Sequence, residues 1–210
     1  MTVRVVVLEM GTANLFSLAS ALRFLGVPFE VTAEPAAMSG ATHLVLPGVG
    51  AFDPAMRQLE AQGLVPAIRH HALERRRPMI GVCLGMQLLF EGSEEGTLPG
   101  LGLLPGRLAR LQSGGGHRVP HVGFSPLHGF ESTGLFDGFA DGASFYFTHS
   151  YALGSDVPAA NAARCAHTVP FVAAVQAANI CGVQFHPEKS QGNGLRLLAN
   201  FVRLPAGEAA

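Results

Sequence analysis

The sequence predicts a single α/β domain spanning residues 1–210, in which helices flank a mostly parallel central sheet that antiparallel strands extend. Two patterns support this fold class. Up to about residue 100, short apolar runs rich in β-branched residues alternate with amphipathic helical stretches, as in parallel sheets built from right-handed βαβ units. Beyond that point, glycines separate several short strand-like segments, which are expected to add antiparallel strands. A length of 210 residues leaves no room for a second catalytic domain of ordinary size.

The first three strands and the first helix are predicted from apolar patterns near the amino terminus. Residues 3–8 form a Val-rich run that is typical of a central parallel strand. Residues 14–25 carry leucines and alanines at helical spacing, and Gly26 is expected to end that helix. Two further strands are predicted at residues 27–31 and 43–46.

A second series of helices surrounds the next predicted strand. Asp53 and Pro54 indicate a helix start, with the aspartate as N-cap and the proline at the first helical position. Another helix is expected over residues 65–76, followed by a buried strand at residues 78–82. The chain is then expected to turn directly into a helix over residues 84–90. In such a sheet, ligands bind at the carboxyl ends of the strands.

The second half of the chain is predicted to contain short strands and one closing helix. Strands are expected at residues 106–111, 119–124, 144–148 and 169–176. A further buried strand is expected to end at residues 183–185, and residues 194–201 have the pattern of a helix. Residues 113–116, Ser-Gly-Gly-Gly, predict a flexible loop that is too short to link two domains.

Composition excludes several classes of function. Hydrophobic residues make up 48% of the chain, which supports a large core. Only 14% of the residues are charged, which indicates either surface buried against a partner protein or simply a large core. A formal net charge of −1 gives no electrostatic basis for binding nucleic acid or an anionic membrane. Polar residues interrupt the uncharged run at residues 165–185, which argues against a membrane span.

The three cysteines indicate a reducing compartment. Cys83, Cys165 and Cys181 form no C-x-x-C pair, so neither a disulfide framework nor a zinc site is suggested. No metal or cofactor is expected. The amino terminus lacks the basic segment and apolar core of a signal peptide, and a cytoplasmic location is therefore expected.

Residues 81–87, Gly-Val-Cys-Leu-Gly-Met-Gln, form a cysteine version of the nucleophile elbow G-x-C-x-G. A nucleophile on such a strand-to-helix turn has a strained backbone, so the residues two positions away must be small, as Gly81 and Gly85 are. The amino end of the following helix favours the thiolate form of Cys83. A cysteine that only packs at a strand end is the competing interpretation, because that is the commoner fate of a free cysteine.

A candidate base and its orienting group lie much later in the chain, in the segment His186-Pro187-Glu188. Side chains two positions apart in an extended segment point to the same side, and Pro187 favours extended geometry in the residue before it. Glu188 is therefore expected to accept a hydrogen bond from one imidazole nitrogen of His186 while the other nitrogen faces Cys83. Nine histidines make a chance His–Glu pair easy to find, but the elbow and H-P-E together predict a catalytic triad.

With these motifs the chain resembles the class I, triad-type glutamine amidotransferases, in which a Cys, a His and a Glu hydrolyse glutamine. More narrowly, it looks like the glutaminase subunits of imidazole glycerol phosphate synthase, an enzyme of histidine biosynthesis. The resemblance extends from Val3 to about Phe201. Its most specific blocks are residues 47–52, 81–96, 120–123, 145–151 and 184–190. It implies a flavodoxin-like fold and a chain whose substrate is glutamine.

The chemistry expected of the triad is acyl transfer. Cys83 is expected to attack the side-chain amide of glutamine, which gives a γ-glutamyl thioester and releases ammonia. His186 is expected to protonate the leaving nitrogen and later to activate water, while Glu188 holds its ring.

The tetrahedral intermediates of this reaction need backbone hydrogen-bond donors. The amide of Leu84, the residue after the nucleophile, is one expected donor. The resemblance implies that the other comes from Val49 or Gly50, which follow the third strand. A glycine-rich turn after a strand is more often only a tight turn. It is not a phosphate loop, because the G-x-x-x-x-G-K-[ST] pattern is absent.

The resemblance also implies the substrate contacts. The residues expected to bind glutamine are Gly50, Gln87, Glu95, His149, Ser150 and Tyr151. Glu95 is expected to meet the α-amino group, with Glu94 beside it as the alternative. Residues 149–151 are expected to recognise the other end of the amino acid through backbone and hydroxyl groups. Without the resemblance, Gln87 is equally well explained as an amide on a helix surface.

The resemblance further implies a heterodimer with a (β/α)8-barrel cyclase subunit that uses the ammonia. Asn14, Tyr146 and Lys189 match positions at the mouth through which ammonia passes to that cyclase. Phe124 and Ser125 stand where the family has a tryptophan, often an interface anchor, and an asparagine. These departures affect the expected interface and leave the expected glutaminase chemistry unchanged.

Three alternatives compete with this interpretation. The chain could be the amidotransferase component of another pathway, such as anthranilate or guanylate synthesis, although those enzymes differ in residues 47–52 and 145–151. It could be a self-sufficient γ-glutamyl hydrolase that needs no partner. It could also be a binding module without activity, but the complete set of Cys83, His186 and Glu188 counts against that.

Overall fold

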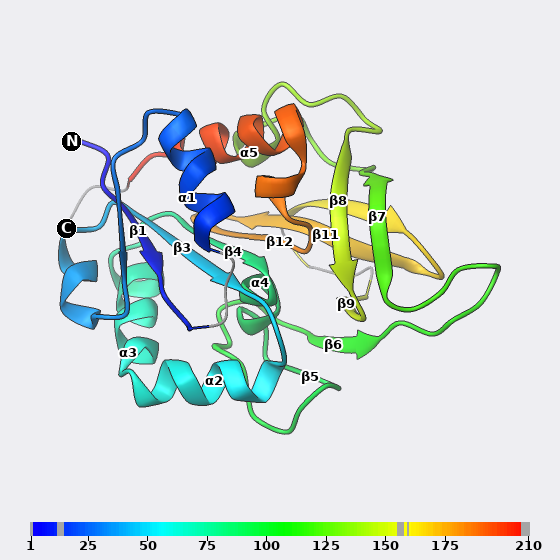
Figure 1. The fold of residues 1–210 in the computed structure, drawn as a ribbon, viewed down its shortest axis with the longest axis horizontal. Coiled ribbons are helices and arrows are strands. Elements are labelled where there is room, and N and C mark those ends of the chain that lie inside the picture. The colour runs from blue at the N-terminus through cyan, green and yellow to red at the C-terminus, as the bar shows by residue number, and fades with distance from the viewer. Residues whose placement is uncertain (1, 12–14, 155–157, 159, 207–210) are drawn as a thin grey trace.

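The computed structural model describes residues 2–11, 15–154, 158 and 160–206 of the chain. Its main feature is a ten-stranded sheet, and Figure 1 shows helices on both faces of it. Five neighbouring strands are parallel, in the order β2 (Phe29–Thr32), β1 (Val5–Leu8), β3 (His43–Gly48), β4 (Met79–Cys83) and β12 (Ile180–Val183). The predicted parallel centre of the sheet is therefore confirmed.

Antiparallel strands extend the sheet beyond β12, as the sequence predicts. They are β11 (Pro170–Ala177), β9 (Tyr151–Leu153), β6 (Arg107–Arg110) and β10 (Asn161–Ala166), which pairs with β11 alone. The short strand β5 (Gly92–Ser93) closes this edge and lies parallel to β6. Both parts belong to one continuous sheet, which agrees with a single α/β fold.

In the part of the chain that the structure describes, five α-helices cover the two faces of the sheet (Figure 1). On one face lie α1 (Leu15–Phe24) and α5 (Gln191–Arg203); on the other lie α2 (Phe52–Ala61), α3 (Leu64–Arg69) and α4 (Leu84–Leu88). Short 3-10 turns occur at Pro35–Gly40, Gly134–Phe136 and Pro187–Lys189. Within the part of the chain that the structure describes, no helix combines the length and apolar character that crossing a membrane requires.

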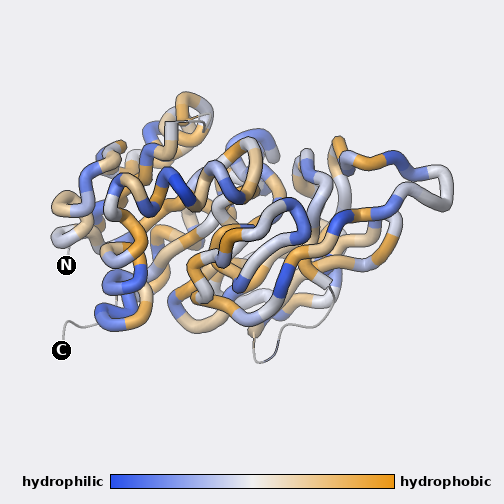
Figure 2. The backbone as a smooth tube through the Cα atoms, turned by 90° about the horizontal axis from the view of Figure 1, so that it is seen from below, coloured by the Kyte–Doolittle hydropathy of each residue, from blue (hydrophilic) through white to orange (hydrophobic). Residues whose placement is uncertain are grey.

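Alternation along β1 explains how the two faces form separate cores. Val5 and Val7 pack with α1 and α5, whereas Val6 and Leu8 pack with α2, α3 and α4. All four are at most 1% exposed, and burying each such side chain stabilises the fold by roughly 1.5–3 kcal/mol. Figure 2 shows the hydropathy along the backbone, with hydrophobic (orange) and hydrophilic (blue) segments alternating.

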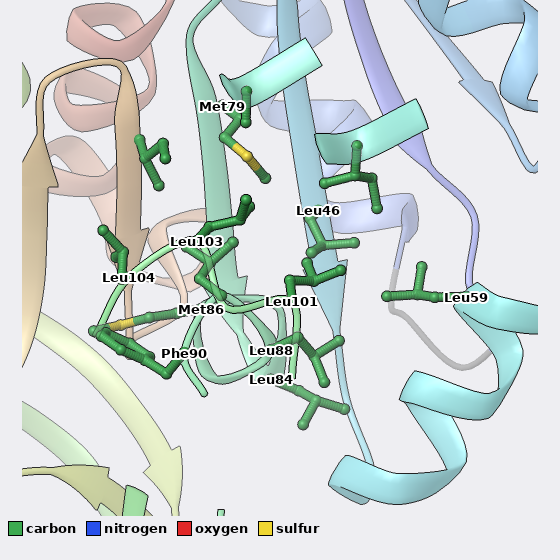
Figure 3. Close-up of a cluster of buried hydrophobic side chains, with 14 of the residues drawn as sticks. Leu46, Leu59, Met79, Leu84, Met86, Leu88, Phe90, Leu101, Leu103 and Leu104 are labelled. Carbon is green, nitrogen blue, oxygen red and sulfur yellow. The ribbon is translucent and has the colours of Figure 1, made fainter. Parts of the chain in front are cut away.

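The core beneath the elbow is shown in Figure 3. Leu84, Met86 and Leu88 project from α4 into a cluster that includes Leu46 of β3 and Phe90. Because these side chains are almost completely buried, the turn that carries Cys83 rests on a closely packed base.

A separate two-stranded ribbon stands beside the main sheet (Figure 1). It consists of β7 (His121–Pro126) and β8 (Ser144–His149), which are antiparallel. Their register places Phe124 opposite Tyr146 and His121 opposite His149. The two ends of this ribbon differ in character, because Phe124 is half exposed and the two histidines are buried.

Several element boundaries differ from the predicted ones. The N-cap assigned to Asp53 is wrong: α2 begins at Phe52, and Ala51 precedes it without a side-chain cap. The carboxylate of Asp53 instead accepts hydrogen bonds from the amides of Thr97 and Leu98. Asp53 thus binds a loop distant in sequence, although the local pattern predicts that it caps the helix.

The helix predicted over residues 65–76 is interrupted. It consists of α3 and then a single wider π-type turn at His70–Glu74. The helix predicted over residues 84–90 ends at Leu88. Strands β5, β9 and β10 were not predicted, because each is short or bordered by loop-like residues.

Candidate active site

Cys83 is the last residue of β4 and the residue before α4. Its backbone has φ +55° and ψ −112°, a conformation rarely adopted by residues with side chains, which costs roughly 1–3 kcal/mol. Gly81 and Gly85 make this turn possible, because a side chain at either position would collide with neighbouring backbone. A side-chain carbon added at Gly81 would lie 2.5 Å from the carbonyl oxygen of Gly85, and one added at Gly85 would overlap the carbonyl of Leu46. The backbone therefore has the geometry of a nucleophile elbow.

His186 and Glu188 follow β12, the strand next to β4. His186 is extended, and its amide donates to the carbonyl of Tyr146 over 2.8 Å. Nδ1 of His186 lies 2.7 Å from Oε1 of Glu188, and the two side chains are only 4% and 5% exposed. The expected pair forms, but through a 3-10 turn at Pro187–Lys189 instead of a fully extended segment.

The surroundings of His186 favour its protonated form. Burial by itself would lower the pKa of this imidazole, but the adjacent Cys83 and Glu188 more than offset burial and raise its pKa to about 9. Since an ionised carboxylate can only accept, Nδ1 of His186 is the donor to Glu188. Nε2 has no hydrogen-bond partner among the described residues and remains for proton transfer.

A cavity of about 330 Å³ opens over Cys83 and His186. Besides these two, it is lined by all the residues expected to bind glutamine or the oxyanion, namely Val49, Gly50, Leu84, Gln87, Glu95, His149, Ser150 and Tyr151. Pro120 and Thr148 complete the lining. Segments far apart in the sequence therefore meet at the carboxyl end of the parallel strands, where a ligand site is expected.

The segment expected to complete the oxyanion hole lies directly against the elbow. Gly48 pairs with Cys83 across β3 and β4. A side-chain carbon at Gly48 would come within 3.1 Å of both the amide nitrogen of Gly85 and the β-carbon of Leu84. Gly50 has φ +103° and open space around its α-carbon, so this position favours glycine for its backbone conformation.

Gln87 is buried and its side-chain nitrogen is hydrogen-bonded, so the alternative of a surface amide is wrong. It is 5% exposed. Its Nε2 donates to Oε1 of Gln184 over 3.0 Å and to the carbonyl of Tyr151 over 3.3 Å. Gln184 in turn places its Nε2 4.0 Å from Sγ of Cys83. These contacts connect Gln87 with both the nucleophile and the cavity wall.

The adjacent residues Glu94 and Glu95 differ in the backbone amides that they bind. Oε2 of Glu95 accepts from the amide of Phe52 at the start of α2, over 2.9 Å, and Glu95 lines the cavity. Oε2 of Glu94 accepts from the amide of Arg110 over 2.8 Å, and Glu94 is not among the residues lining the cavity. The geometry therefore favours Glu95 for contact with a ligand.

The residues expected to face a partner cluster next to the triad. Nζ of Lys189 lies 5.8 Å from the ring centre of Tyr146, and the rings of Tyr146 and Phe124 are 5.5 Å apart. Phe124 is 51% exposed. Asn14, the remaining expected contact, lies outside the described residues.

Sequence reasoning missed four residues near the site: Pro120, His121, Thr148 and Gln184. The carbonyl of Thr148 lies 4.0 Å from Sγ of Cys83. For Gln184 a signal existed, because it is a polar residue between Val183 and Phe185 in an apolar run and is almost completely buried. The others come close only through the register of the ribbon.

Residues 6–204 match the model of the family described as Glutamine amidotransferase class-I. The chain belongs to this family. Curated relatives support the assignment over nearly the whole length. The imidazole glycerol phosphate synthase subunit HisH of Synechococcus sp. (strain JA-3-3Ab) is 43% identical, over 99% of each chain. Its counterpart of the same name from Desulfitobacterium hafniense (strain DSM 10664 / DCB-2) is 44% identical, over 93% of this chain and 92% of that one.

Solved structures show the same amidotransferase fold. A putative GMP synthase protein from Thermoplasma acidophilum has a TM-score of 0.73 at 17% identity, covering 97% of this chain and 94% of that chain. A structure described as a glutamine amidotransferase gives 0.72 at 17% identity, covering 95% and 97%. These two likenesses establish the fold alone.

Proposed function

We propose that this class-I amidotransferase is the glutaminase subunit of an imidazole glycerol phosphate synthase and supplies ammonia for histidine biosynthesis. Relatives that carry this subunit name are 43–45% identical over 93–99% of the chain. One observation supports the activity above all others: Cys83 and His186 face one cavity, and Glu188 holds the imidazole from behind.

The first half-reaction releases ammonia. The sulfur of Cys83 attacks the side-chain carbonyl carbon of glutamine and forms a tetrahedral intermediate. Amides of Leu84 and of Val49 or Gly50 stabilise its oxyanion. The protonated His186 then donates from Nε2 to the leaving nitrogen, the carbon–nitrogen bond breaks, and a γ-glutamyl thioester remains. A raised pKa suits His186 to this acid role.

The second half-reaction restores the enzyme. His186, now neutral, removes a proton from water, and the resulting nucleophile attacks the thioester carbon. Collapse of the second tetrahedral intermediate breaks the carbon–sulfur bond and releases glutamate. The sum is glutamine and water in, glutamate and ammonia out. Glu188 stabilises the imidazolium in both halves through its bond to Nδ1.

Glutamine is proposed to lie between two walls of the cavity. Glu95 provides a carboxylate for the α-ammonium group, with Oε1 left for it because Oε2 is bound to Phe52. The other wall consists of residues 149–151, whose backbone and hydroxyl groups recognise the remaining end of the amino acid. Gln87 completes the cavity near the reacting amide.

A (β/α)8-barrel cyclase is the proposed consumer of the ammonia, in a heterodimer and in the cytoplasm. Its docking surface is proposed to include Phe124, Tyr146 and Lys189, together with Asn14. Two features support this placement: an exposed aromatic side chain beside the triad, and a lysine exposed immediately after Glu188. Aromatic residues are enriched in the anchors of protein interfaces.

The test is a glutaminase assay of the complete chain, first alone and then with both the cyclase and its sugar-phosphate nucleotide. We expect weak activity of the chain alone and a rise in rate of about 10²–10³-fold in the complex, which is the effect of one oxyanion-hole donor on kcat. Val49→Pro removes one backbone donor and should weaken this stimulation, whereas Val49→Ala serves as the matched control.

Other outcomes would redirect the assignment. Full activity of the isolated chain would identify a stand-alone γ-glutamyl hydrolase. Stimulation only by the synthase of another pathway would place the chain there.

A further inference from the structure

Three hydrogen bonds in a row connect β7 to the cavity wall, and the mechanism above uses none of them. The Ser125 hydroxyl lies 2.9 Å from Nε2 of His121. Nδ1 of His121 lies 3.1 Å from Nε2 of His149. Nδ1 of His149 lies 2.9 Å from the carbonyl oxygen of Tyr151. The row begins on the ribbon and ends at a residue that lines the cavity.

The direction of every bond in this row is determined by its last member. A carbonyl oxygen can only accept, so Nδ1 of His149 carries the hydrogen. Burial lowers the pKa of His149 to about 3 and that of His121 to about 4, so both rings are neutral near pH 7. Nε2 of His149 must then accept from Nδ1 of His121, and Nε2 of His121 must accept from Ser125.

The rings in this row are held firmly by their neighbours. His121 is 2% exposed and stacks on Phe147, with 4.8 Å between ring centres. It also stacks on His167, with 4.2 Å between ring centres, and the ring of Phe171 lies edge-on with its centre 5.9 Å away. His149 is 6% exposed. Neither ring can turn freely to replace a lost partner with water.

The carbonyl at the end of the row has a second bond. A carbonyl oxygen has two lone pairs, and that of Tyr151 accepts from Gln87 as well as from His149. Gln87 uses its other amide hydrogen on Gln184, which reaches the sulfur of Cys83. The Tyr151 carbonyl and Gln184 thus hold the amide of Gln87 together at the cavity.

We propose that His121 is a positioning residue for the glutamine pocket. Through His149 it holds the carbonyl of Tyr151 and the amide of Gln87, so the wall that receives glutamine is formed before the substrate arrives. This inference rests on the proposed function. It adds a role for a residue outside the triad and outside the cavity lining.

The main test is His121→Phe, measured in the complex of the full chain with its cyclase partner. Phenylalanine keeps the ring and its stacking but removes both nitrogens, so Nε2 of His149 loses its donor. We expect the KM for glutamine to rise about tenfold and kcat to stay within about twofold, because the lost contact orients bound substrate and does not touch the reacting atoms.

Two further variants distinguish a positioning role of His121 from a general loss of structure. His121→Asn keeps a donor near the position of Nδ1 and should restore most of the affinity, leaving KM within about threefold of wild type. His167→Phe is the matched control. It keeps the stacking on His121, and its own hydrogen bond to the carbonyl of Arg118 lies outside the row. Its KM should be unchanged.

Covalent labelling of Cys83 distinguishes failure of this inference from failure of the proposed function. A chloroketone analogue of glutamine needs the pocket wall, whereas methyl methanethiolsulfonate needs only the thiolate. In His121→Phe the first reagent should label about tenfold more slowly and the second at the wild-type rate. If the chloroketone did not label wild-type Cys83 at all, the proposed glutaminase function would fail first.

Three results would overturn the positioning role. The first is a wild-type KM and wild-type chloroketone labelling in His121→Phe. The second is a fall in kcat with KM unchanged. The third is equal slowing of both reagents in the Phe and Asn variants, which would indicate a general loss of structure.

Discussion

Two histidines line the same cavity, but near neutral pH one is protonated and the other is neutral. His186 and His149 are buried to a similar extent, with 3% and 6% of their surface exposed. The pKa of His186 is raised to about 9, whereas that of His149 is lowered to about 3. Burial lowers both, so burial cannot explain the difference.

Their hydrogen-bond partners explain it. His186 bonds to the carboxylate of Glu188 and lies beside the sulfur of Cys83, and both groups raise its pKa. His149 has only a carbonyl and a neutral imidazole as partners, and nearby histidines disfavour a further positive charge. The side of the cavity with His186 can therefore transfer a proton, whereas the side with His149 stays neutral and keeps its hydrogen bonds unchanged.

Of all the changes on the side of the cavity that contains His186, removal of the nucleophile Cys83 should lower glutamine hydrolysis the most. We expect Cys83→Ala to lower glutamine hydrolysis by about 10⁵–10⁶, to the background level, while the fold and partner binding persist. Ammonia release measures hydrolysis, circular dichroism the fold, and co-purification with the cyclase the partner binding. Cys165→Ala is the matched control and should keep full activity. Turnover by Cys83→Ala at the wild-type rate would end the mechanism.

The same comparison predicts selective labelling. Burial raises the pKa of Cys165 to about 11 and also raises that of Cys181, so both remain thiols at neutral pH. A glutamine-like electrophile should therefore modify Cys83 alone, as peptide mapping would show. Equal modification of all three cysteines would contradict a specially activated Cys83.

The next largest effects separate the base from its orienting group. His186→Ala should cost about 10⁵–10⁶ in kcat, because the proton has no other carrier. Glu188→Gln should cost less, about 10⁴, because the imidazole remains and loses only its stabilising charge. Steady-state kinetics of both variants, with melting curves as the folding control, checks the ranking. Two equally inactive and folded variants would require a more direct role for Glu188.

The smallest expected effect is on stability, and it tests the protonation states of His186 and His149 directly. The folded-state pKa of His186, about 9, lies above its ordinary value of 6.5, so its stabilisation is complete below pH 6.5 and lost as pH rises through 9. For His149 the sign is reversed, and stability is lost as pH falls from 6.5 towards 3. We expect the free energy of unfolding to fall by on the order of 2 kcal/mol between pH 6.5 and 9.5.

Urea denaturation across this range would test the assignment. Glu188→Gln should reduce the alkaline loss. Asp141→Asn removes the carboxylate from an exposed His–Asp pair with His128 and serves as the control, since exposed pairs contribute little. An identical pH slope in Glu188→Gln and wild type would show that the carboxylate does not set the protonation of His186.

The parallel half of the fold could be predicted because its strands are continuous apolar runs, and the elbow because its glycines are required by sterics. Other features depend on contacts that local sequence does not specify. Asp53 resembles an N-cap, yet its partner Thr97 lies 44 residues away. Glu94 and Glu95 are indistinguishable in sequence and are separated only by the backbone amides that each one meets.

The second wall of the cavity was the hardest part to predict for the same reason. His121 and His149 come together only because β7 and β8 pair in one particular register. A shift of one residue would place each side chain on the opposite face of the ribbon. The family resemblance implied His149 as a pocket residue and included His121 in the block at residues 120–123, but it gave His121 no role in the pocket.

The bond from the amide of Phe52 to Glu95 has a consequence for substrate choice. In the proposed binding mode, one carboxylate oxygen anchors the start of α2 and the other receives the α-ammonium group. A primary amide that lacks an amino group, such as glutaramate, leaves the second oxygen without a cation inside the cavity. Discrimination against such amides is therefore built into the same carboxylate that fixes the helix, and a change at Glu95 would relax selectivity and loosen the scaffold together.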